Sequence, residues 1–518
     1  MNRRLLAALT LFLAGCATTT PVTVPPQPSV RFKILQINDV YKIEGLEAGN
    51  VGGMARVRTL RKMLEMDGTP VFVMHAGDAL FPSVMSKYLD AKPIVDVMNM
   101  LDGDASKFDN KMMFGLGNHE LDKSDDKILL ARLKESQFTW VVTNTEYCPA
   151  PNDCKQFSSL GNPVVDTVTH DVGPVKVGVI GLLYPMAKPY ARSTDVVAAA
   201  RDTHFTLADV GDNVTVAITH QDLDDDIRLA QAVPGIDIII GGHDHLFLQR
   251  HIGSTWITKA DADAKSAIVY DVTVDPQGGV KTVPLRISLD ATMPKDPDVD
   301  ARVQMWMGKL AEKLGGLQTI GMTENLLEGV EPAVRGRETA LGNLLTDVAR
   351  EQMGTDIAIL NGGSIRINDN IPPGPITNYD MEGIFYYKND LIATQVTGQQ
   401  LLDMLNNSVS RVEAGDGRFL QVSGMRFRYG QRDNKFVVDA ADVTVGEKSL
   451  DLGATYSLAT IDYVYLNGTD DGYTLFGDAT RPPKINVERE ADLRVTVEKY
   501  MRAQGTVTQN VEGRIARK

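Results

Sequence analysis

The sequence predicts an α/β protein built from two domains. From residue 31 onward, short apolar segments alternate with amphipathic segments of helical period, which is the pattern of β-strands joined by α-helices. At 518 residues the chain is too long for one ordinary hydrophobic core. Polar residues gather directly after several predicted strands, and α/β proteins place their ligand sites at those strand ends.

The composition narrows the class of partner. The chain is 43% hydrophobic and 23% charged, with a formal net charge of −14, as expected of a globular protein. This negative charge argues against a nucleic-acid polymer as the partner, because no general positive field attracts one. A small anionic substrate would therefore have to be held by local metal ions and a few arginines.

The first 30 residues predict export. Residues 1–16 combine two arginines with an apolar run over 5–13 that is too short to span a bilayer. The stretch Leu13-Ala14-Gly15-Cys16 resembles the lipobox of bacterial lipoproteins, which implies lipidation of Cys16; an ordinary cleaved signal peptide is the alternative. Because Ala17 is not aspartate, we expect an outer-membrane anchor facing the periplasm, followed by an extended tether rich in Thr and Pro over 17–30.

The first domain is predicted to cover residues 31–292. Its expected helices include 53–66 and 94–101. Its expected strands cover residues 32–37, 71–75, 111–114, 140–143, 175–182, 214–219 and 236–240.

A linker is predicted over residues 293–321. Residues 298–314 are expected to form a helix that presents one apolar face, and Gly315-Gly316 is a suitable stop signal. The second α/β domain then covers residues 322–518. All eight histidines lie at or before His251, so metal chemistry is expected in the first domain.

The most informative stretch runs from Gly115 to Asp122, directly after an apolar strand. Asn118 offers an amide oxygen to a metal ion, and His119 carries the side chain whose ordinary pKa lies nearest neutrality. Asp122, three residues further on, could orient that imidazole. A histidine–carboxylate pair beside a metal ligand suits hydrolysis, although a turn with a surface histidine is the structural alternative.

Similar clusters follow other predicted strands. Each has a structural explanation when taken alone, because an aspartate can cap a helix and a histidine can satisfy a turn. Together they supply carboxylates, an amide and imidazoles, the mixed set that suits Mn, Co, Fe or Zn in a two-metal hydrolase. The residues are Asp39, Asp78, Asn118, His119, His220, His243 and His245.

At this point the chain resembles the calcineurin-like metallophosphoesterases, and more narrowly the secreted 5′-nucleotidases and UDP-sugar hydrolases. The resemblance implies a four-layer α/β/β/α sandwich and two divalent metal ions about 3.5–4 Å apart, bridged by Asp78. Asp39 and His245 would hold one metal, and Asn118, His220 and His243 the other. His119, positioned by Asp122, would stabilise the transferring phosphoryl group or protonate the leaving oxygen, and a metal-activated water would be the nucleophile.

One position departs from the family pattern, which is Asp-x-His after the first strand. Here Asp39-Val40 is followed by Tyr41. Because a phenol is a poorer ligand than imidazole at neutral pH, we expect a first metal site that binds weakly, prefers a harder metal or uses an extra water. This departure also motivates an inactive, nucleotide-binding relative as an alternative.

The second domain carries motifs that the resemblance assigns to substrate binding. In Ala358-Ile359-Leu360-Asn361-Gly362-Gly363-Ser364-Ile365-Arg366 an apolar strand runs into a glycine turn, and the Arg366 guanidinium could clamp phosphate oxygens. Phe419 and Tyr473 match the positions where the family sandwiches a nucleobase between two rings, and Asn389 is a candidate base or ribose contact. The resemblance also implies a hinge rotation at the linker that carries the nucleotide to the metals.

Cys148 and Cys154 are the remaining cysteines. In an oxidising compartment their spacing favours a small disulfide loop, whereas two metal thiolates would lack further cysteines to complete a site.

The expected function is metal-dependent hydrolysis of nucleoside 5′-monophosphates, with UDP-sugars as a further substrate class. A 2′,3′-cyclic nucleotide phosphodiesterase and a catalytically degenerate nucleotide-binding lipoprotein are the alternatives. Oligomeric state is left open by the sequence.

Overall fold

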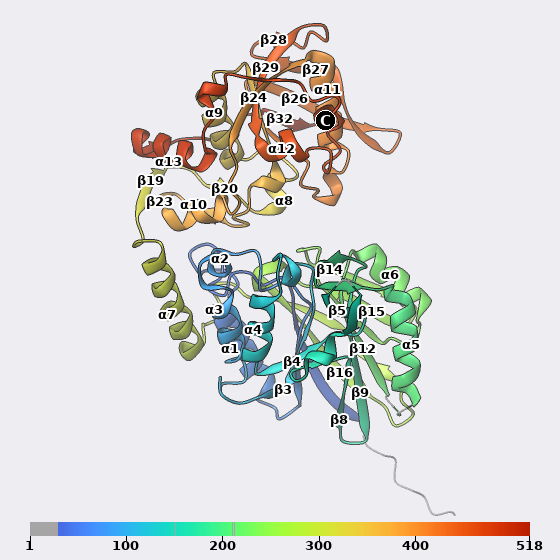
Figure 1. Ribbon diagram of the computed structural model, residues 1–518. Helices are drawn as coiled ribbons and strands as arrows, with labels where there is room; N and C mark the ends of the chain where they lie inside the picture. The colour runs from blue at the N-terminus through green and yellow to red at the C-terminus, as the bar shows by residue number, and fades with distance from the viewer. Residues whose placement is uncertain (1–28, 151, 210, 212) are drawn as a thin grey trace, which may run out of the picture.

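The protein is described by a computed structural model that covers residues 29–150, 152–209, 211 and 213–518. Two domains lie one above the other, joined along one side by helix α7 (Pro297–Lys313) (Figure 1). The predicted signal with Cys16, and all but the last two residues of the predicted tether, lie outside the described residues. Within the described part of the chain, no helix has both the length and the apolar character needed to cross a membrane.

The first domain contains two large sheets. In the first sheet, β1, β2, β3, β4 and β7 run parallel and β16 pairs antiparallel with β1. Its strands are β1 (Val30–Ile37), β2 (Val71–His75), β3 (Asp109–Gly115), β4 (Phe138–Val141), β7 (Val164–Val165), β16 (Ser266–Val274), β17 (Val280–Lys281) and β18 (Pro284–Ser288).

The second sheet has the order β14-β15-β13-β12-β9-β8, with its four central strands parallel. The strands are β8 (Thr167–Val172), β9 (Val175–Leu183), β12 (Val214–His220), β13 (Ile238–Gly241), β14 (Leu248–Ile252) and β15 (Thr255–Lys259). β12 is buried at every residue, as expected of a central parallel strand that is covered on both faces.

These sheets pack face to face between two layers of helices. Side chains such as Ile34, Met113, Val216 and Ile240 fill the space between the sheets. The outer face of the first sheet is covered by α1 (Met54–Glu65), α3 (Lys92–Met98), α4 (Lys127–Glu135) and α7. The outer face of the second is covered by α5 (Val196–Asp209) and α6 (Leu223–Ala232) (Figure 1). The observed layers are therefore α/β/β/α, as predicted.

A smaller sheet extends one end of this domain. It comprises β10 (Ala187–Lys188), β11 (Ala191–Ser193), β5 (Thr145–Ala150) and β6 (Asp153–Gln156). Cys148 of β5 and Cys154 of β6 form a disulfide, the pairing that the sequence favours.

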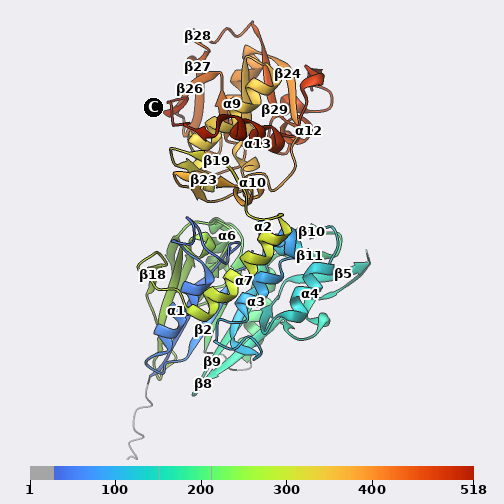
Figure 2. The ribbon, with the colours of Figure 1, turned by 90° about the vertical axis from the view of Figure 1, so that its left-hand side faces the viewer.

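Helix α7 matches the predicted linker helix to within one residue at each end. The Asp296 side chain caps it by accepting from two backbone N–H groups at 3.2 Å, and Pro297 occupies the first turn. Its apolar face packs on the helix layer of the first domain, and Gly315 and Gly316 follow with left-handed backbone angles. Figure 2 shows α7 running along the first domain toward the second.

The second domain is a separate α/β unit that begins with β19 (Thr319–Thr323), three residues before the predicted boundary. β19 already pairs with β23 (Gly374–Thr377) and β31 (Thr506–Val507), so residues 319–321 belong to this domain and not to the linker. Its main sheet contains β25 (Leu420–Ser423), β21 (Ile357–Asn361), β29 (Thr455–Ile461), β24 (Leu391–Thr397) and β30 (Lys484–Ile485).

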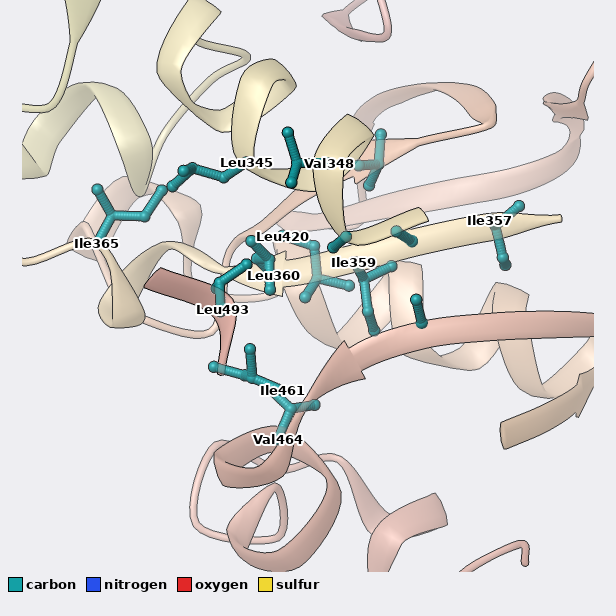
Figure 3. Packing of buried hydrophobic residues seen from close by; sticks show 14 of the residues in the cluster. Leu345, Val348, Ile357, Ile359, Leu360, Ile365, Leu420, Ile461, Val464 and Leu493 are labelled. Carbon is teal, nitrogen blue, oxygen red and sulfur yellow. The ribbon is translucent and has the colours of Figure 1, made fainter. Parts of the chain in front are cut away.

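A second four-stranded sheet and several helices complete this domain. The sheet contains β28 (Lys448–Ser449), β27 (Lys435–Val445), β26 (Met425–Arg432) and β32 (Ile515–Arg517). The helices include α8 (Glu331–Val334), α9 (Ala340–Met353), α10 (Asn378–Ile384), α11 (Gly398–Val409), α12 (Asp462–Asn467) and α13 (Leu493–Gln504). Figure 3 shows Leu345 and Val348 of α9 over Ile359 of β21 in one continuous core.

Candidate active site

The predicted polar clusters converge at the ends of five strands. Asp39, Asp78 and Asn118 follow β1, β2 and β3 of the first sheet, while His220 ends β12 and His243 follows β13 of the second. Because the carboxyl ends of these parallel strands lie at one edge of each packed sheet, side chains far apart in sequence meet there.

The backbone of this cluster is strained. Asp39, Asp78, His243 and His245 have positive φ angles of 52°, 59°, 81° and 58°, a region that non-glycine residues seldom adopt. Next to them, Gly117 packs so closely that an added Cβ would stand 2.1 Å from Asp78 Oδ1. Such strain persists only where the surrounding structure holds it, and it concentrates at functional sites.

Buried acceptor atoms face one another at the centre. One ligand atom from each of Asp39, Asp78 and His220 lies within 4.8 Å of the other two, and all three residues are buried. His220 Nε2 lies 3.1 Å from both Asp78 Oδ2 and Asn118 Oδ1. His245 Nε2 lies 3.3 Å from Asp39 Oδ1.

The imidazoles turn the same nitrogen toward this centre. His220 Nδ1–H donates to the Ala76 carbonyl at 2.8 Å, and His245 Nδ1–H donates to Glu331 Oε2 at 2.8 Å. In a neutral imidazole held this way, Nε2 is an acceptor. The Nε2 atoms of His220 and His245 would then be acceptors that face carboxylate and amide oxygens, which are also acceptors. Such an arrangement needs a cation between the two sets of atoms. The donor set therefore fits divalent metal ions.

The pKa values of His220 and His243 also indicate how charge is balanced at this centre. Burial lowers the pKa of His220, but Asp78 and Asp39 raise it by more, to about 9. Burial and the neighbouring His220 lower the pKa of His243 to about 4, which leaves this imidazole neutral and available as a ligand. The His243 backbone N–H donates to Asp39 Oδ2 at 3.0 Å, and its ring centroid lies 5.2 Å from that of His220.

Tyr41 lies inside this centre. Its hydroxyl donates to Asp78 Oδ2 at 3.1 Å and stands 3.2 Å from His245 Nε2. Burial and the carboxylates of Asp78 and Asp39 raise its pKa well above the ordinary value for tyrosine. At neutral pH the group is therefore a phenol that donates a hydrogen bond.

His119 and Asp122 form the predicted pair. His119 Nδ1–H donates to Asp122 Oδ2 at 2.7 Å, and its Nε2 lies 3.9 Å from Asp78 Oδ2. Burial lowers the pKa of His119, but Asp78 and Asp122 raise it by more, so its net pKa is raised. A proton on Nε2 is therefore held at the edge of the carboxylate centre.

Glu120 supports the site in a way that sequence reasoning missed. Its carboxylate is fully buried and accepts from four backbone N–H groups at 2.7–3.0 Å, those of Gly117, Asp78, Ala79 and Leu80. Burial raises its pKa to about 6. The residue thereby ties the turn after β2 to the turn after β3. Its place between His119 and Leu121 was the only signal in the sequence.

Lys259 connects two turns at the edge of the second sheet in a similar way. Its ammonium is completely buried, forms ion pairs with Asp226 and Asp244, and donates to the backbone carbonyls of Gln221 and Gly242. It thus fixes the two turns that carry His220 and His243.

A cleft of about 940 Å³ lies between the domains. The first domain contributes Tyr41, Asp78, His119, His243 and His245 to its lining. The second contributes Glu331, Arg335, Arg366, Tyr386 and the loop 411–417. The carboxylate–imidazole centre therefore shares one cavity with three arginines of the second domain, Arg335, Arg366 and Arg411.

Some of the predicted substrate residues of the second domain lie at the cleft, and others are buried. The Arg366 guanidinium lines the cleft. The Gly363 N–H donates to the Gly417 carbonyl at 2.9 Å, close to the cleft loop. Asn361 is buried and donates to Asp471 at 3.2 Å, and Asn389 is buried and donates to the Tyr387 carbonyl at 3.3 Å.

The two aromatic rings expected to sandwich a base are core residues in this structure. Phe419 is 0% exposed and Tyr473 is 1% exposed, and both belong to the main hydrophobic core of the second domain. The Tyr473 hydroxyl donates to the Arg418 carbonyl, and the Phe419 ring packs 6.4 Å from that of Tyr429. Neither ring has a free face as it lies in this structure, so a base does not fit between them here, and the loop 411–417 before Phe419 lines the cleft.

Comparisons with known proteins agree with this geometry. Residues 32–247 match the family model for calcineurin-like phosphoesterases, and residues 319–478 match that for the 5′-nucleotidase C-terminal domain. Snake venom 5′-nucleotidase of Naja atra is 27% identical over 94% of this chain and 98% of that protein.

Two bacterial proteins extend the comparison. The 5′-nucleotidase precursor from Thermus thermophilus superposes with a TM-score of 0.75 at 25% identity, covering 94% of this chain and 99% of that one. The trifunctional nucleotide phosphoesterase YfkN of Bacillus subtilis is 26% identical over 86% of this chain, which spans only 32% of that protein.

Proposed function

Because this chain belongs to the metallophosphoesterases of the 5′-nucleotidase type, a class of hydrolases, we propose that its substrates are nucleoside 5′-monophosphates, with UDP-sugars as a further class. The observation that carries the proposal is the cleft between the domains. A centre of buried carboxylates and imidazoles lies on one wall, and Arg335 and Arg366 lie on the other. A phosphate ester bound between them would meet metal ligands and guanidinium donors together.

The fold implies divalent metal binding, and we propose two ions. Asp39 and His245 would hold one, Asn118, His220 and His243 the other, and Asp78 both. Bound ions of this kind lower the pKa of water and neutralise charge on a phosphoryl group. Mn, Co, Zn and Fe all suit the mixed oxygen and nitrogen donors.

The remaining residues have distinct roles in the proposal. Asp122 would orient His119 by accepting the 2.7 Å hydrogen bond from Nδ1–H, and the protonated imidazole, which lines the cleft, would carry a second hydrogen on Nε2. His119 would donate this proton to the leaving oxygen or stabilise the phosphoryl group. The Arg366 guanidinium would bind phosphate oxygens and hold the ester in register.

Location is part of the proposal. The residues before the first domain support export, with Cys16 as the lipidated residue of an outer-membrane anchor facing the periplasm. Membrane contact would be through this lipid alone.

Tyr41 supports one alternative, a nucleotide-binding protein without turnover. Its phenol contacts Asp78 and His245, which are proposed ligands of the first metal, at the residue where the family pattern has an imidazole. A 2′,3′-cyclic phosphodiesterase could use the same donor set, and substrate profiling separates it from the main proposal.

The test is a substrate profile with Arg366→Ala as the variant. We expect the wild-type chain to release phosphate from AMP faster than it opens 2′,3′-cyclic AMP, and to cleave UDP-glucose. Arg366→Ala should raise KM for AMP by ~10- to 100-fold, the equivalent of one charge-assisted hydrogen bond of about 1.5–3 kcal/mol. Arg428→Ala, an exposed arginine paired with Asp442, is the matched control. Preference for the cyclic substrate would overturn the assignment.

A further inference from the structure

His245 differs from the other oriented imidazoles in where its support comes from. His119 Nδ1 is held by Asp122 and His220 Nδ1 by the Ala76 carbonyl, both in the first domain. His245 Nδ1–H donates instead to Glu331 Oε2 at 2.8 Å, and Glu331 is the first residue of α8 in the second domain. One candidate metal ligand is therefore oriented from across the domain boundary.

Glu331 is firmly fixed at this boundary. Its side chain is 13% exposed, and its other oxygen, Oε1, is paired with Arg335. Its backbone N–H donates to Asn368 Oδ1 at 3.0 Å, and Asn368 in turn reaches Asp263 of the first domain at 3.4 Å. Asp263 accepts from the backbone N–H of Tyr41 at 2.9 Å. The contact thus belongs to a continuous polar network that joins the Tyr41 turn to the second domain.

The hydrogen bond between Glu331 and His245 affects the nitrogen of His245 that is the candidate metal ligand. A carboxylate on Nδ1–H fixes the tautomer of an imidazole, increases its basicity and aims Nε2. His245 Nε2 faces Asp39 Oδ1 at 3.3 Å and the Tyr41 hydroxyl at 3.2 Å. Glu331 thereby supplies the orientation that a metal ligand needs, although it does not itself reach the centre.

We propose that Glu331 is a positioning residue for His245, through which the second domain sets the metal affinity of the first metal position. The inference rests on the proposed function, because it requires that a metal binds at His245. A domain movement that breaks the 2.8 Å contact would release His245 and weaken that site. By linkage, metal at that site would stabilise the arrangement in which the contact is made.

The experiment is titration of the metal-stripped full chain with Co²⁺ by isothermal calorimetry. Glu331→Ala should weaken one binding event by about 10- to 100-fold, the usual effect of removing a carboxylate behind a metal-bound histidine. The event assigned to Asn118, His220 and His243 should keep its affinity. Asp122→Ala is the matched control, because Asp122 likewise orients an imidazole that lines the cleft, that of His119, which is not a candidate ligand. It should change neither affinity by more than ~3-fold, an effect expected of lost charge alone.

Each outcome separates positioning from its alternatives. Unchanged affinities in Glu331→Ala would overturn the inference, and so would equal losses in both variants, since that result would reflect the charge of the cleft alone. If Glu331→Ala shows no cooperative thermal transition, Glu331→Gln takes its place. This variant keeps an acceptor for Nδ1–H but loses the charge, so a loss of about 3- to 10-fold is expected, and no loss would overturn the inference. A wild-type chain that binds no Co²⁺ at all would instead refute the proposed function itself, and the inference with it.

Discussion

Tyr41 donates its phenolic hydrogen to Asp78 Oδ2 across 3.1 Å, at the centre of the candidate metal site. The same hydroxyl lies 3.2 Å from His245 Nε2. Since burial and two carboxylates raise the pKa of Tyr41 well above its ordinary value, the group remains a neutral donor. A hydrogen-bond donor therefore lies among the candidate metal ligands, at the residue where the related pattern has an imidazole.

Replacing this phenol should change metal binding. Tyr41→His would supply an imidazole nitrogen, so we expect affinity for the first metal to rise by ~10-fold or more, about 1.4 kcal/mol. Tyr41→Phe, which keeps the ring but adds no ligand, should show no such gain. Calorimetric titration with Mn²⁺ measures both variants. Equal affinities for Tyr41→His and the wild type would show that this position does not limit metal binding.

Asp122 should matter for turnover more than for binding. Asp122→Asn removes the charge that orients His119 across 2.7 Å, and we expect kcat to fall by about 10- to 100-fold with little change in KM. Steady-state kinetics with AMP measures the two constants separately. Asp125→Asn, an exposed carboxylate paired with Lys127, is the control. A kcat that survives in Asp122→Asn would remove His119 from the proposed proton transfer.

Phe419 should be important for stability. Because the ring is fully buried in the second domain, Phe419→Ala should lower the free energy of unfolding by about 3–5 kcal/mol. Urea denaturation followed by circular dichroism measures this loss. A variant of unchanged stability that selectively loses affinity for AMP, but not for p-nitrophenyl phosphate, would restore the stacking role and contradict the burial seen here.

Asp237 should make stability depend on pH. Burial raises its pKa to about 6, partly offset by a hydrogen bond from the Thr215 N–H at 2.9 Å. Between about pH 4 and pH 6 the folded chain then binds more protons at this group than the unfolded chain, so stability falls as the pH rises.

Asp237→Asn, which can keep the acceptor for Thr215, should remove this loss. We expect the variant to unfold with the wild type at pH 4 and to be more stable by on the order of 2 kcal/mol at pH 7. Urea denaturation at the two pH values checks this. A stability difference that does not change with pH would contradict the raised pKa.

The sequence was most informative where structure and chemistry are local. Strands β1, β2, β12 and β13 are short, mainly apolar segments, and polar residues lie at or just after their ends, so the strands and the candidate ligands could be predicted from neighbouring residues. The linker helix was predictable for the same reason, because its apolar period, Asp296 cap and terminal glycines are all contiguous.

Contacts between distant residues were not predictable in this way. Glu331 reaches His245 across 86 positions and a domain boundary, and nothing in the residues around Glu331 indicates that partner. Phe419 and Tyr473 lie in motifs that suggested a ligand, but packing of the second domain buries both rings. Glu120 stood in the most informative stretch, yet its role depends on N–H groups from a turn some 40 residues away.

The most direct test of the account is phosphate release from AMP by the chain that begins after Cys16. The protein would be stripped of metal, resupplied in turn with Mn²⁺, Co²⁺, Zn²⁺ or Mg²⁺, and compared with Asp78→Asn. We predict release that depends on added metal and is abolished in the variant, since Asp78 lies at the centre of the donor set. No release with any metal, from a folded wild-type chain that still binds AMP, would contradict the enzyme assignment and favour a nucleotide-binding protein with Tyr41 in a degenerate site.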